Sequence, residues 1–254
     1  MKKTFTLKIF RGTPGKQYWE EFELELRPFM NITSALMQIQ QNPINKNKKK
    51  VTPVAWEQGC LEEVCGSCSM LVNGYPRQAC TLLVEDTLRA MATDTLVIAP
   101  FTKYPLVRDL VVNRDDMFDA LKTIHAWIDV DDALDRGFGP KVNQDIAEAR
   151  YVLSKCMTCG CCMEACPQIN VHSKFIGPAP ISQVRLFNSH PVGEMNAPER
   201  LRPLMEEGGV TDCGNAQNCA AVCPQKIPLT ESIALMGRKV VTQGIKDLFS
   251  LPDA

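Results

Sequence analysis

The stretch Cys156–Pro167 reads CMTCGCCMEACP, with five cysteines in twelve residues and a proline at its end. Four of these cysteines have the spacing CxxCxxCxxxCP, namely Cys156, Cys159, Cys162 and Cys166. This spacing is typical of bacterial ferredoxins, where three cysteines hold one iron-sulfur cluster and the fourth reaches a second cluster. The fifth, Cys161, lies between two ligands and is expected to point away from the iron. We interpret it as a small packed hydrophobic residue rather than a ligand.

Residues 213–224 read CGNAQNCAAVCP and repeat this spacing with one change. Cys213, Cys219 and Cys223 stand at the first, third and fourth cysteine places of the ferredoxin run, before a proline. Ala216 stands at the second place. One thiolate is therefore missing from the pair of cluster sites that the two runs predict.

Two ligand sets follow from the ferredoxin rule that the fourth cysteine of each run crosses to the other cluster. The set predicted for a [4Fe-4S] cluster is Cys156, Cys159, Cys162 and Cys223. The set predicted for a second cluster is Cys166, Cys213 and Cys219. Three thiolates suit a [3Fe-4S] cluster, because a fourth iron would have no protein thiolate. A labile [4Fe-4S] cluster with water at the open corner remains an alternative.

An earlier group of cysteines has a different spacing. It consists of Cys60, Cys65, Cys68 and Cys80. The intervals of five and three residues match the plant-type [2Fe-2S] loop. Gly59 and Gly66 suit backbone that wraps closely around sulfide, because they carry no Cβ. A zinc site is the alternative, but zinc sites usually pair two CxxC segments and this group contains one.

The first hundred residues alternate between strand and helix patterns. Residues 4–10 (TFTLKIF) and 20–26 (EEFELEL) alternate apolar and polar side chains, as half-buried strands do. Residues 31–43 then change to helical spacing and end in Asn-Pro. Asn73-Gly74 lies between short apolar segments and predicts a β-hairpin. The N-terminal half is therefore predicted to be α+β.

The second half of the chain has helical periodicity. Residues 114–128 (RDDMFDALKTIHAWI) place apolar side chains at helical intervals as far as Ile128. The change of period predicts two domains, a [2Fe-2S] domain over residues 1–106 and an all-α domain over 107–254 with the two other clusters.

His125 and His190 are interpreted as packing or capping residues, since neither is paired with a nucleophile.

Composition excludes several classes of function. The chain has 28 basic and 29 acidic residues, so no global field would attract nucleic acid. The densest basic stretch, residues 46–50, is interpreted as a solvated loop. No segment is apolar enough to span a membrane, and Lys8 interrupts the apolar core that a signal peptide would need. The prediction is a protein of the cytosol or of a cytosolic membrane face, where twelve cysteines would rarely form disulfides.

With the ligands assigned, the chain resembles the iron-sulfur subunits of the succinate dehydrogenase and fumarate reductase family, the respiratory complex II of the tricarboxylic acid cycle. The resemblance rests on CLEEVCGSC, SKCMTCGCCMEACP, KFIGPAP, QVRLFN and NCAAVCP, in this order. It implies a β-grasp ferredoxin domain followed by a helical ferredoxin domain. It also implies a flavoprotein subunit with FAD, and a membrane anchor with haem b that holds the subunit at the cytoplasmic face of the cell membrane. Electrons would pass from FAD through the [2Fe-2S], [4Fe-4S] and [3Fe-4S] clusters to quinone.

The sequence departs from the ubiquinone-linked members of that family near the quinone. Those members carry a tryptophan shortly after the CP of the second group and a histidine after the first cysteine of the third. Here Pro167 is followed by QINVH, and Gly214 follows Cys213. This looks more like the menaquinone-linked members. Pro167 and His172 remain candidates near the quinone, and His172 could donate a proton there because an unperturbed histidine has a pKa of about 6.5.

Two other functions stay open at the level of sequence. The chain could be the iron-sulfur component of another flavin-linked complex, because it carries no substrate site of its own. It could also be a stand-alone ferredoxin, although a free carrier would rarely need three clusters.

Overall fold

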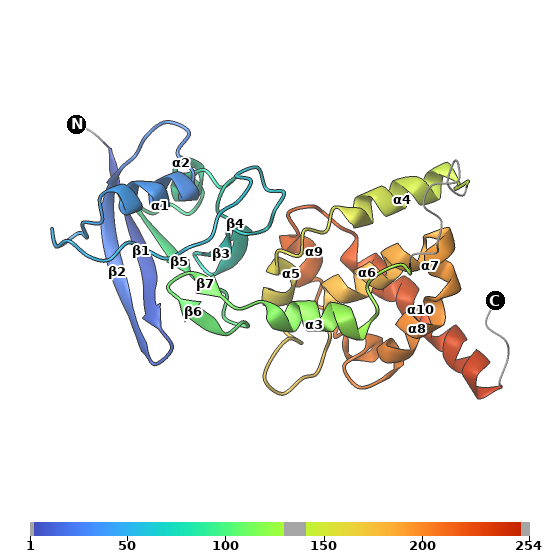
Figure 1. Cartoon of the computed structure of the whole chain (residues 1–254). Coiled ribbons are helices and arrows are strands. Elements are labelled where there is room, and N and C mark those ends of the chain that lie inside the picture. The colour runs from blue at the N-terminus through green and yellow to red at the C-terminus, as the bar shows by residue number, and fades with distance from the viewer. Residues whose placement is uncertain (1–2, 130–140, 250–254) are drawn as a thin grey trace. The chain divides into compact units, whose positions relative to one another are not determined.

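The computed structural model describes residues 3–129 and 141–249, and its contacts divide the chain into two units (Figure 1). The first unit comprises Met1–Arg114 and Met157–Ala165, and the second comprises Asp115–Cys156 and Cys166–Ala254. The boundary predicted after residue 106 thus falls inside the first unit. The reason is that strands β6 (Leu106–Arg108) and β7 (Val111–Val112) form a hairpin there, and β6 contacts β1.

The first unit is built on a five-stranded sheet with the order β2-β1-β5-β3-β4. The strands are β1 (Thr4–Thr13), β2 (Lys16–Glu25), β3 (Ser69–Val72), β4 (Tyr75–Gln78) and β5 (Thr95–Ala99). β1 pairs in parallel with β5, and the other pairs are antiparallel. Helices α1 (Ile32–Gln41) and α2 (Val84–Ala90) complete the α+β unit. A mixed sheet packed on helix α1 is the β-grasp arrangement that the resemblance implied.

The local predictions for this unit are confirmed. Both predicted strands form, and inward residues of β1 alternate with outward ones. Helix α1 begins after Asn31, whose side chain accepts the backbone N–H of Ser34 at 2.8 Å. Asn73 and Gly74 have φ angles of 48° and 81° in the β3–β4 hairpin, as a two-residue turn of mirror-image type requires.

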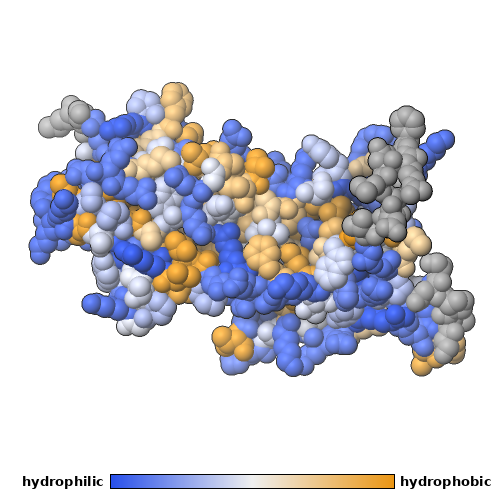
Figure 2. Space-filling model, in the orientation of Figure 1, coloured by the Kyte–Doolittle hydropathy of each residue, from blue (hydrophilic) through white to orange (hydrophobic). Residues whose placement is uncertain are grey.

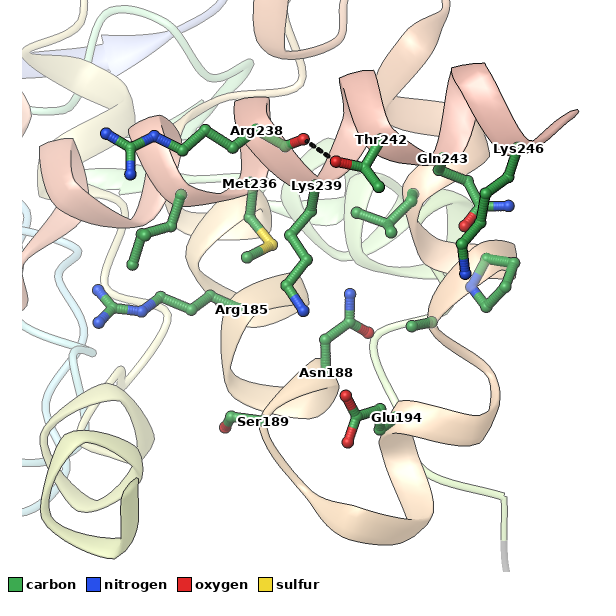
Figure 3. Close-up of a pocket in the computed structure, with 14 residues that line it drawn as sticks. Arg185, Asn188, Ser189, Glu194, Met236, Arg238, Lys239, Thr242, Gln243 and Lys246 are labelled. Atoms are coloured by element: carbon green, nitrogen blue, oxygen red, sulfur yellow. Dashed lines mark hydrogen bonds between the residues drawn. The ribbon is translucent and has the colours of Figure 1, made fainter. Parts of the chain in front are cut away.

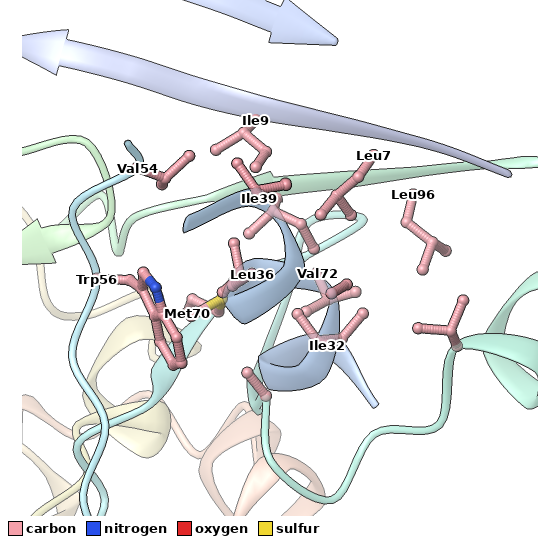
Figure 4. Packing of buried hydrophobic residues seen from close by; sticks show 14 of the residues in the cluster. Leu7, Ile9, Ile32, Leu36, Ile39, Val54, Trp56, Met70, Val72 and Leu96 are labelled. Carbon is pink, nitrogen blue, oxygen red and sulfur yellow. The ribbon is translucent and has the colours of Figure 1, made fainter. Parts of the chain in front are cut away.

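The core of the first unit lies between helix α1 and the sheet. Figure 4 shows the apolar side chains of α1 turned toward side chains of the strands. Fully buried members from the helix include Ile32, Leu36 and Ile39, and those from the strands include Leu7, Ile9, Leu96 and Ile98. The apolar side chains that recur at helical intervals in α1 therefore pack against those that alternate along the strands, and together they form one apolar layer.

The lysine-rich stretch 46–50 forms an exposed loop, as predicted. Lys46 lies 3.0 Å from a carboxylate oxygen of Glu21, and Lys48 lies 3.7 Å from one of Glu23. Both partners belong to β2, the edge strand of the sheet. The loop thus brings positive charge to an edge whose outward side chains are acidic.

The second unit is helical. Its helices are α3 (Asp115–Thr123), α4 (Gln144–Ser154), α6 (Pro178–Asn188), α7 (Pro191–Met195), α8 (Ala197–Leu201), α9 (Asn218–Val222) and α10 (Leu229–Leu248). Short 3-10 turns follow at Arg202–Met205 and Val210–Asp212. α6 and α10 pack together around buried residues that include Ile181, Val184, Leu204, Ile233 and Met236.

Helix α3 ends earlier than the apolar periodicity predicted. It stops at Thr123 rather than continuing to Ile128. His125 has a φ angle of 49°, which breaks the helix. The buried guanidinium of Arg200 donates to the carbonyl oxygens of His125 (3.0 Å) and Trp127 (2.6 Å). In a longer helix these carbonyl oxygens would accept backbone N–H groups instead.

Within residues 3–129 and 141–249, no helix is long and apolar enough to cross a membrane. Figure 2 shows a face on which hydrophilic residues predominate and hydrophobic residues form small groups.

Candidate iron-sulfur sites

Cys60 lies in a loop whose backbone surrounds its sulfur atom. The Sγ atom accepts three backbone N–H groups at 3.3 Å each, from Glu62, Val64 and Cys65. Leu61 and Glu63 adopt left-handed backbone conformations, with φ angles of 62° and 58°. These two inversions turn successive N–H groups toward the sulfur, which creates a nest suited to an anionic thiolate.

Cys65 receives similar support. Its Sγ accepts the N–H groups of Cys60 at 3.3 Å and Ser67 at 3.5 Å. A hydrogen bond from the Ser67 side chain, with these backbone donors, lowers the pKa of Cys65 to about 6. A Cβ added at Gly59 would lie 2.9 Å from the Cys65 sulfur. The loop therefore favours thiolate and leaves room next to it, as a cluster ligand requires.

The other two cysteines of this group, Cys68 and Cys80, are buried, with 3% and 4% exposure. Burial raises the pKa of Cys68 to about 12. Metal ligation would have to displace the thiol proton, because the thiolate is the ligand. The donor set of four thiols, two of them in an N–H-rich loop, fits a [2Fe-2S] cluster.

Arg114 fixes the cluster loop from a distant part of the sequence. Its guanidinium donates to the carbonyl oxygens of Gly66 at 3.1 Å and Ser67 at 3.3 Å. Gly66 has a φ angle of 73°, and a Cβ there would lie 2.9 Å from the Cβ of Cys159. Gly66 is thus required both for the turn and for close packing of the segment 157–165 on the loop.

Glu164 anchors the segment 157–165 within the first unit. Its carboxylate accepts the backbone N–H groups of Thr102 (3.0 Å) and Lys103 (3.1 Å) and the hydroxyl of Thr102 (2.6 Å). A carboxylate with three donors is satisfied although it is buried. The segment that carries Cys159 and Cys162 is therefore held by a short loop that follows strand β5.

Cys161 is completely buried, as its interpretation as a packed residue predicted. The amide nitrogen Nε2 of Gln78 donates to its sulfur at 3.6 Å. A hydrogen bond from the Cys161 side chain lowers the pKa of Cys159 to about 7, and the same interaction raises the pKa of Cys161. A hydrogen bond from the Cys161 thiol therefore favours the thiolate form of Cys159.

Three of the predicted ligands line one pocket of the second unit. They are Cys166, Cys213 and Cys219. Ala216 and Pro167 line the same pocket. Burial raises the pKa of Cys219, and the nearby Cys166 and Cys213 raise it further. The chemistry of a pocket lined by three cysteines, with alanine at the fourth place of the ferredoxin spacing, suits a cluster held by three ligands.

The remaining predicted residues are distributed over both units. Cys159 and Cys162 lie in the first unit, and Cys156 and Cys223 lie in the second. This four-ligand set stays a prediction. His172 is exposed and is not among the residues that line the pocket of the three cysteines.

The other two histidines have structural contacts, as predicted. The ring of His125 lies 4.9 Å from that of Trp127. His190 caps α7, since its Nδ1 accepts the N–H of Val192 at 3.2 Å.

In the part of the chain that the structure describes, no three His, Cys, Asp or Glu side chains are arranged to hold a single metal ion.

Known families match both cysteine-bearing regions. Residues 6–119 match a 2Fe-2S iron-sulfur cluster binding domain, and residues 152–227 match a 4Fe-4S dicluster domain. The succinate dehydrogenase iron-sulfur subunit of Bacillus subtilis is 52% identical over 232 residues, which cover 91% of this chain and 90% of the relative. The chain belongs to the family of iron-sulfur subunits of succinate dehydrogenase and fumarate reductase.

Further comparisons agree with this family. The fumarate reductase iron-sulfur subunit of Wolinella succinogenes is 26% identical over 249 residues, covering 95% of this chain and 99% of the relative. A chain of the Mycobacterium smegmatis Sdh1 complex in the apo form has the same fold, with a TM-score of 0.80 at 20% identity over 96% of this chain and 98% of that one. As a member of this family, the chain is an electron-transfer subunit of an oxidoreductase.

Proposed function

We propose that this chain carries electrons from the FAD of a flavoprotein subunit to quinone at a membrane anchor. When bound, the clusters would accept and release single electrons in the order [2Fe-2S], [4Fe-4S], [3Fe-4S]. The observation that carries the proposal is the pocket that Cys166, Cys213 and Cys219 line together with Ala216. A dicluster domain whose second site has three thiols is suited to a series of clusters of different potential.

The proposed ligands divide into three sets. Cys60, Cys65, Cys68 and Cys80 would hold the [2Fe-2S] cluster. Cys156, Cys159, Cys162 and Cys223 would hold the [4Fe-4S] cluster, and Cys166, Cys213 and Cys219 the [3Fe-4S] cluster. The N–H groups directed at Cys60 and Cys65 support the first set, because hydrogen bonds to sulfur stabilise thiolate and help to set a cluster's potential.

Partners and location are part of the same proposal. The chain would bind a flavoprotein subunit and an anchor with haem b at the cytoplasmic face of the cell membrane. Menaquinone would be the acceptor, since Gly214 stands where ubiquinone-linked members carry histidine. Pro167, in the three-cysteine pocket, is the proposed quinone-proximal residue. His172 remains a candidate proton donor.

The iron content of the native complex tests the proposed function. We expect about nine irons for each copy of this chain after correction for haem, because the three cluster types hold two, four and three irons. Iron and acid-labile sulfide would be measured after anaerobic purification, and mass spectrometry would identify the companion subunits. About four irons together with tightly bound zinc would contradict the proposal, as would purification without a flavoprotein.

Substitution of two adjacent cysteines tests the ligand register. We expect Cys161→Ser to keep all three clusters, because Cys161 is surplus to the ligand count and serine can still accept from Gln78. We expect Cys162→Ser to lose the [4Fe-4S] signal. Low-temperature EPR of both variants provides the measurement, and each variant is the other's control. Loss of a cluster in Cys161→Ser alone would mean that the ligands are one residue out of register.

A further inference from the structure

The second unit contains a pocket of about 560 Å³ that none of the proposed cluster ligands lines. Residues of α6, α7, α8 and α10 form its walls (Figure 3). Apolar side chains, among them Leu201, Leu235 and Met236, contribute part of the surface. The volume lies in the range of small-molecule sites, which is about 300–1,000 Å³.

The pocket is strongly cationic. Of the described residues that line it, four are basic and one, Glu194, is acidic. The basic residues are Arg185, Arg238, Lys239 and Lys246. Arg185 is paired with Glu231 at 2.8 Å. No ion pair of the other three is formed within residues 3–129 and 141–249. Glu194 and Glu231 offset part of the positive charge, and the pocket keeps a net positive charge.

A buried amide in the wall also lacks an acceptor. Asn188 is 7% exposed, and its Oδ1 accepts from Nη1 of the buried Arg200 at 3.1 Å. Since Arg200 is a donor only, this contact fixes which end of the amide faces it. The nitrogen Nδ2 must face the other way, and it has no hydrogen-bond partner.

Figure 3 shows where that nitrogen lies. The Nδ2 atom of Asn188 and the ammonium group of Lys239 are turned toward the same part of the pocket. Because Nδ2 is itself buried, a ligand in the open part of the pocket would first meet the ammonium groups of Lys239 and Lys246.

We propose that this pocket binds the phosphate group of a ligand that also has an apolar portion. A phosphate offers several acceptor oxygens and more than one negative charge, which suits Lys239 and Lys246 together better than a single carboxylate. The apolar side chains beside them would contact the rest of the ligand. Free phosphate compounds and phospholipid headgroups share this chemistry.

The test uses the full chain with its clusters, titrated with inorganic phosphate by calorimetry and, separately, mixed with vesicles of phosphatidylglycerol or of neutral phosphatidylcholine. We expect Lys239→Gln/Lys246→Gln to weaken binding by at least about tenfold, since each lost charge-assisted contact is worth about that factor. The control is Lys122→Gln/Lys174→Gln, which removes the same charge from the same unit. Both control lysines lie outside the pocket, in exposed pairs with Asp119 and Glu207, and we expect binding within about twofold of the parent.

A second variant separates loss of the site from loss of folding. Asn188→Asp keeps an oxygen for Arg200 and adds a negative charge to the wall from which the ligand's phosphate would be repelled. We expect it to abolish phosphate binding with no fall in the unfolding temperature. An Asn188→Asp protein that still binds phosphate as tightly as the parent would overturn the proposal.

The two probes also identify the source of the phosphate. Binding of inorganic phosphate indicates a free phosphate compound, and binding only to phosphatidylglycerol vesicles indicates a lipid headgroup. Either result supports the site if the lysine pair is required. If neither probe binds, or if both lysine double variants weaken binding equally, the proposal is wrong, and an acidic segment of another protein becomes the better explanation of the charge.

Discussion

Ala216→Cys is expected to convert the proposed three-iron cluster into a [4Fe-4S] cluster. Ala216 lines the same pocket as Cys166, Cys213 and Cys219, and it occupies the one place where the repeated ferredoxin spacing lacks a cysteine. A thiolate at this position would supply the fourth corner with a protein ligand. EPR would therefore lose the signal of an oxidised [3Fe-4S] cluster and gain that of a reduced [4Fe-4S] cluster.

The conversion should also slow the reduction of quinone. An added thiolate brings negative charge, and net charge is one of the factors that set the potential of a cluster. A lower potential would make this cluster a poorer acceptor from its neighbour. We expect succinate to reduce the first two clusters at the normal rate while the transfer to quinone slows, which redox-titrated EPR and rapid-freeze kinetics would measure.

Ala221→Cys is the matched control, because it adds a thiol to the same segment at a residue that does not line the pocket. It should keep the three-iron signal. If Ala216→Cys also keeps that signal unchanged, either residue 216 points away from the open corner or the crossing of Cys166 and Cys223 between the two clusters has been assigned incorrectly.

Local sequence signals predicted the elements whose determinants lie close together. The end of α1 depends on the adjacent Asn42 and Pro43, and the Asn73-Gly74 turn depends on two adjacent residues with positive φ. The cysteine spacings are also local signals, because the ligands in a cluster-binding loop are only a few residues apart in the sequence. These features could be recognised without any knowledge of the tertiary structure.

The groups that support the cluster loops could not be predicted in this way. Arg114 reaches a carbonyl 48 residues away, and Glu164 accepts from a backbone 62 residues away. The early end of α3 has the same origin, since Arg200 takes a carbonyl oxygen 75 residues before it. A buried arginine or glutamate in an apolar stretch is a signal that some partner exists, but the sequence does not say which one.

Replacement of the buried Arg11 should cost the first unit much of its stability. Its side chain is 1% exposed. Nη1 lies 2.6 Å from a carboxylate oxygen of Glu20, and Nε lies 3.1 Å from one of Asp109. Nη2 donates to the carbonyl oxygen of Thr52 at 2.9 Å. The guanidinium thus joins the β1–β2 hairpin to the segment that leads into the [2Fe-2S] loop.

Asp109 completes this buried network. It is 2% exposed, and its carboxylate accepts the backbone N–H groups of Gly12 at 2.7 Å and Ala55 at 2.8 Å. One carboxylate therefore holds strand β1 and the approach to the cluster loop at the same time. Removal of the arginine would leave the buried Glu20 without its cation and Asp109 with only the half-exposed Arg108, at 3.9 Å.

We expect Arg11→Met to destabilise the first unit by about 3–5 kcal/mol, because breaking a buried ion pair from one side leaves uncompensated charge. The [2Fe-2S] absorbance should be lost at a lower denaturant concentration than in the parent, together with the far-UV signal of the sheet. Arg89→Met is the control in the same unit. It removes an exposed pair with Asp86 and should cost less than about 1 kcal/mol. Equal unfolding midpoints for the two variants would show that the buried network contributes no more than a surface ion pair.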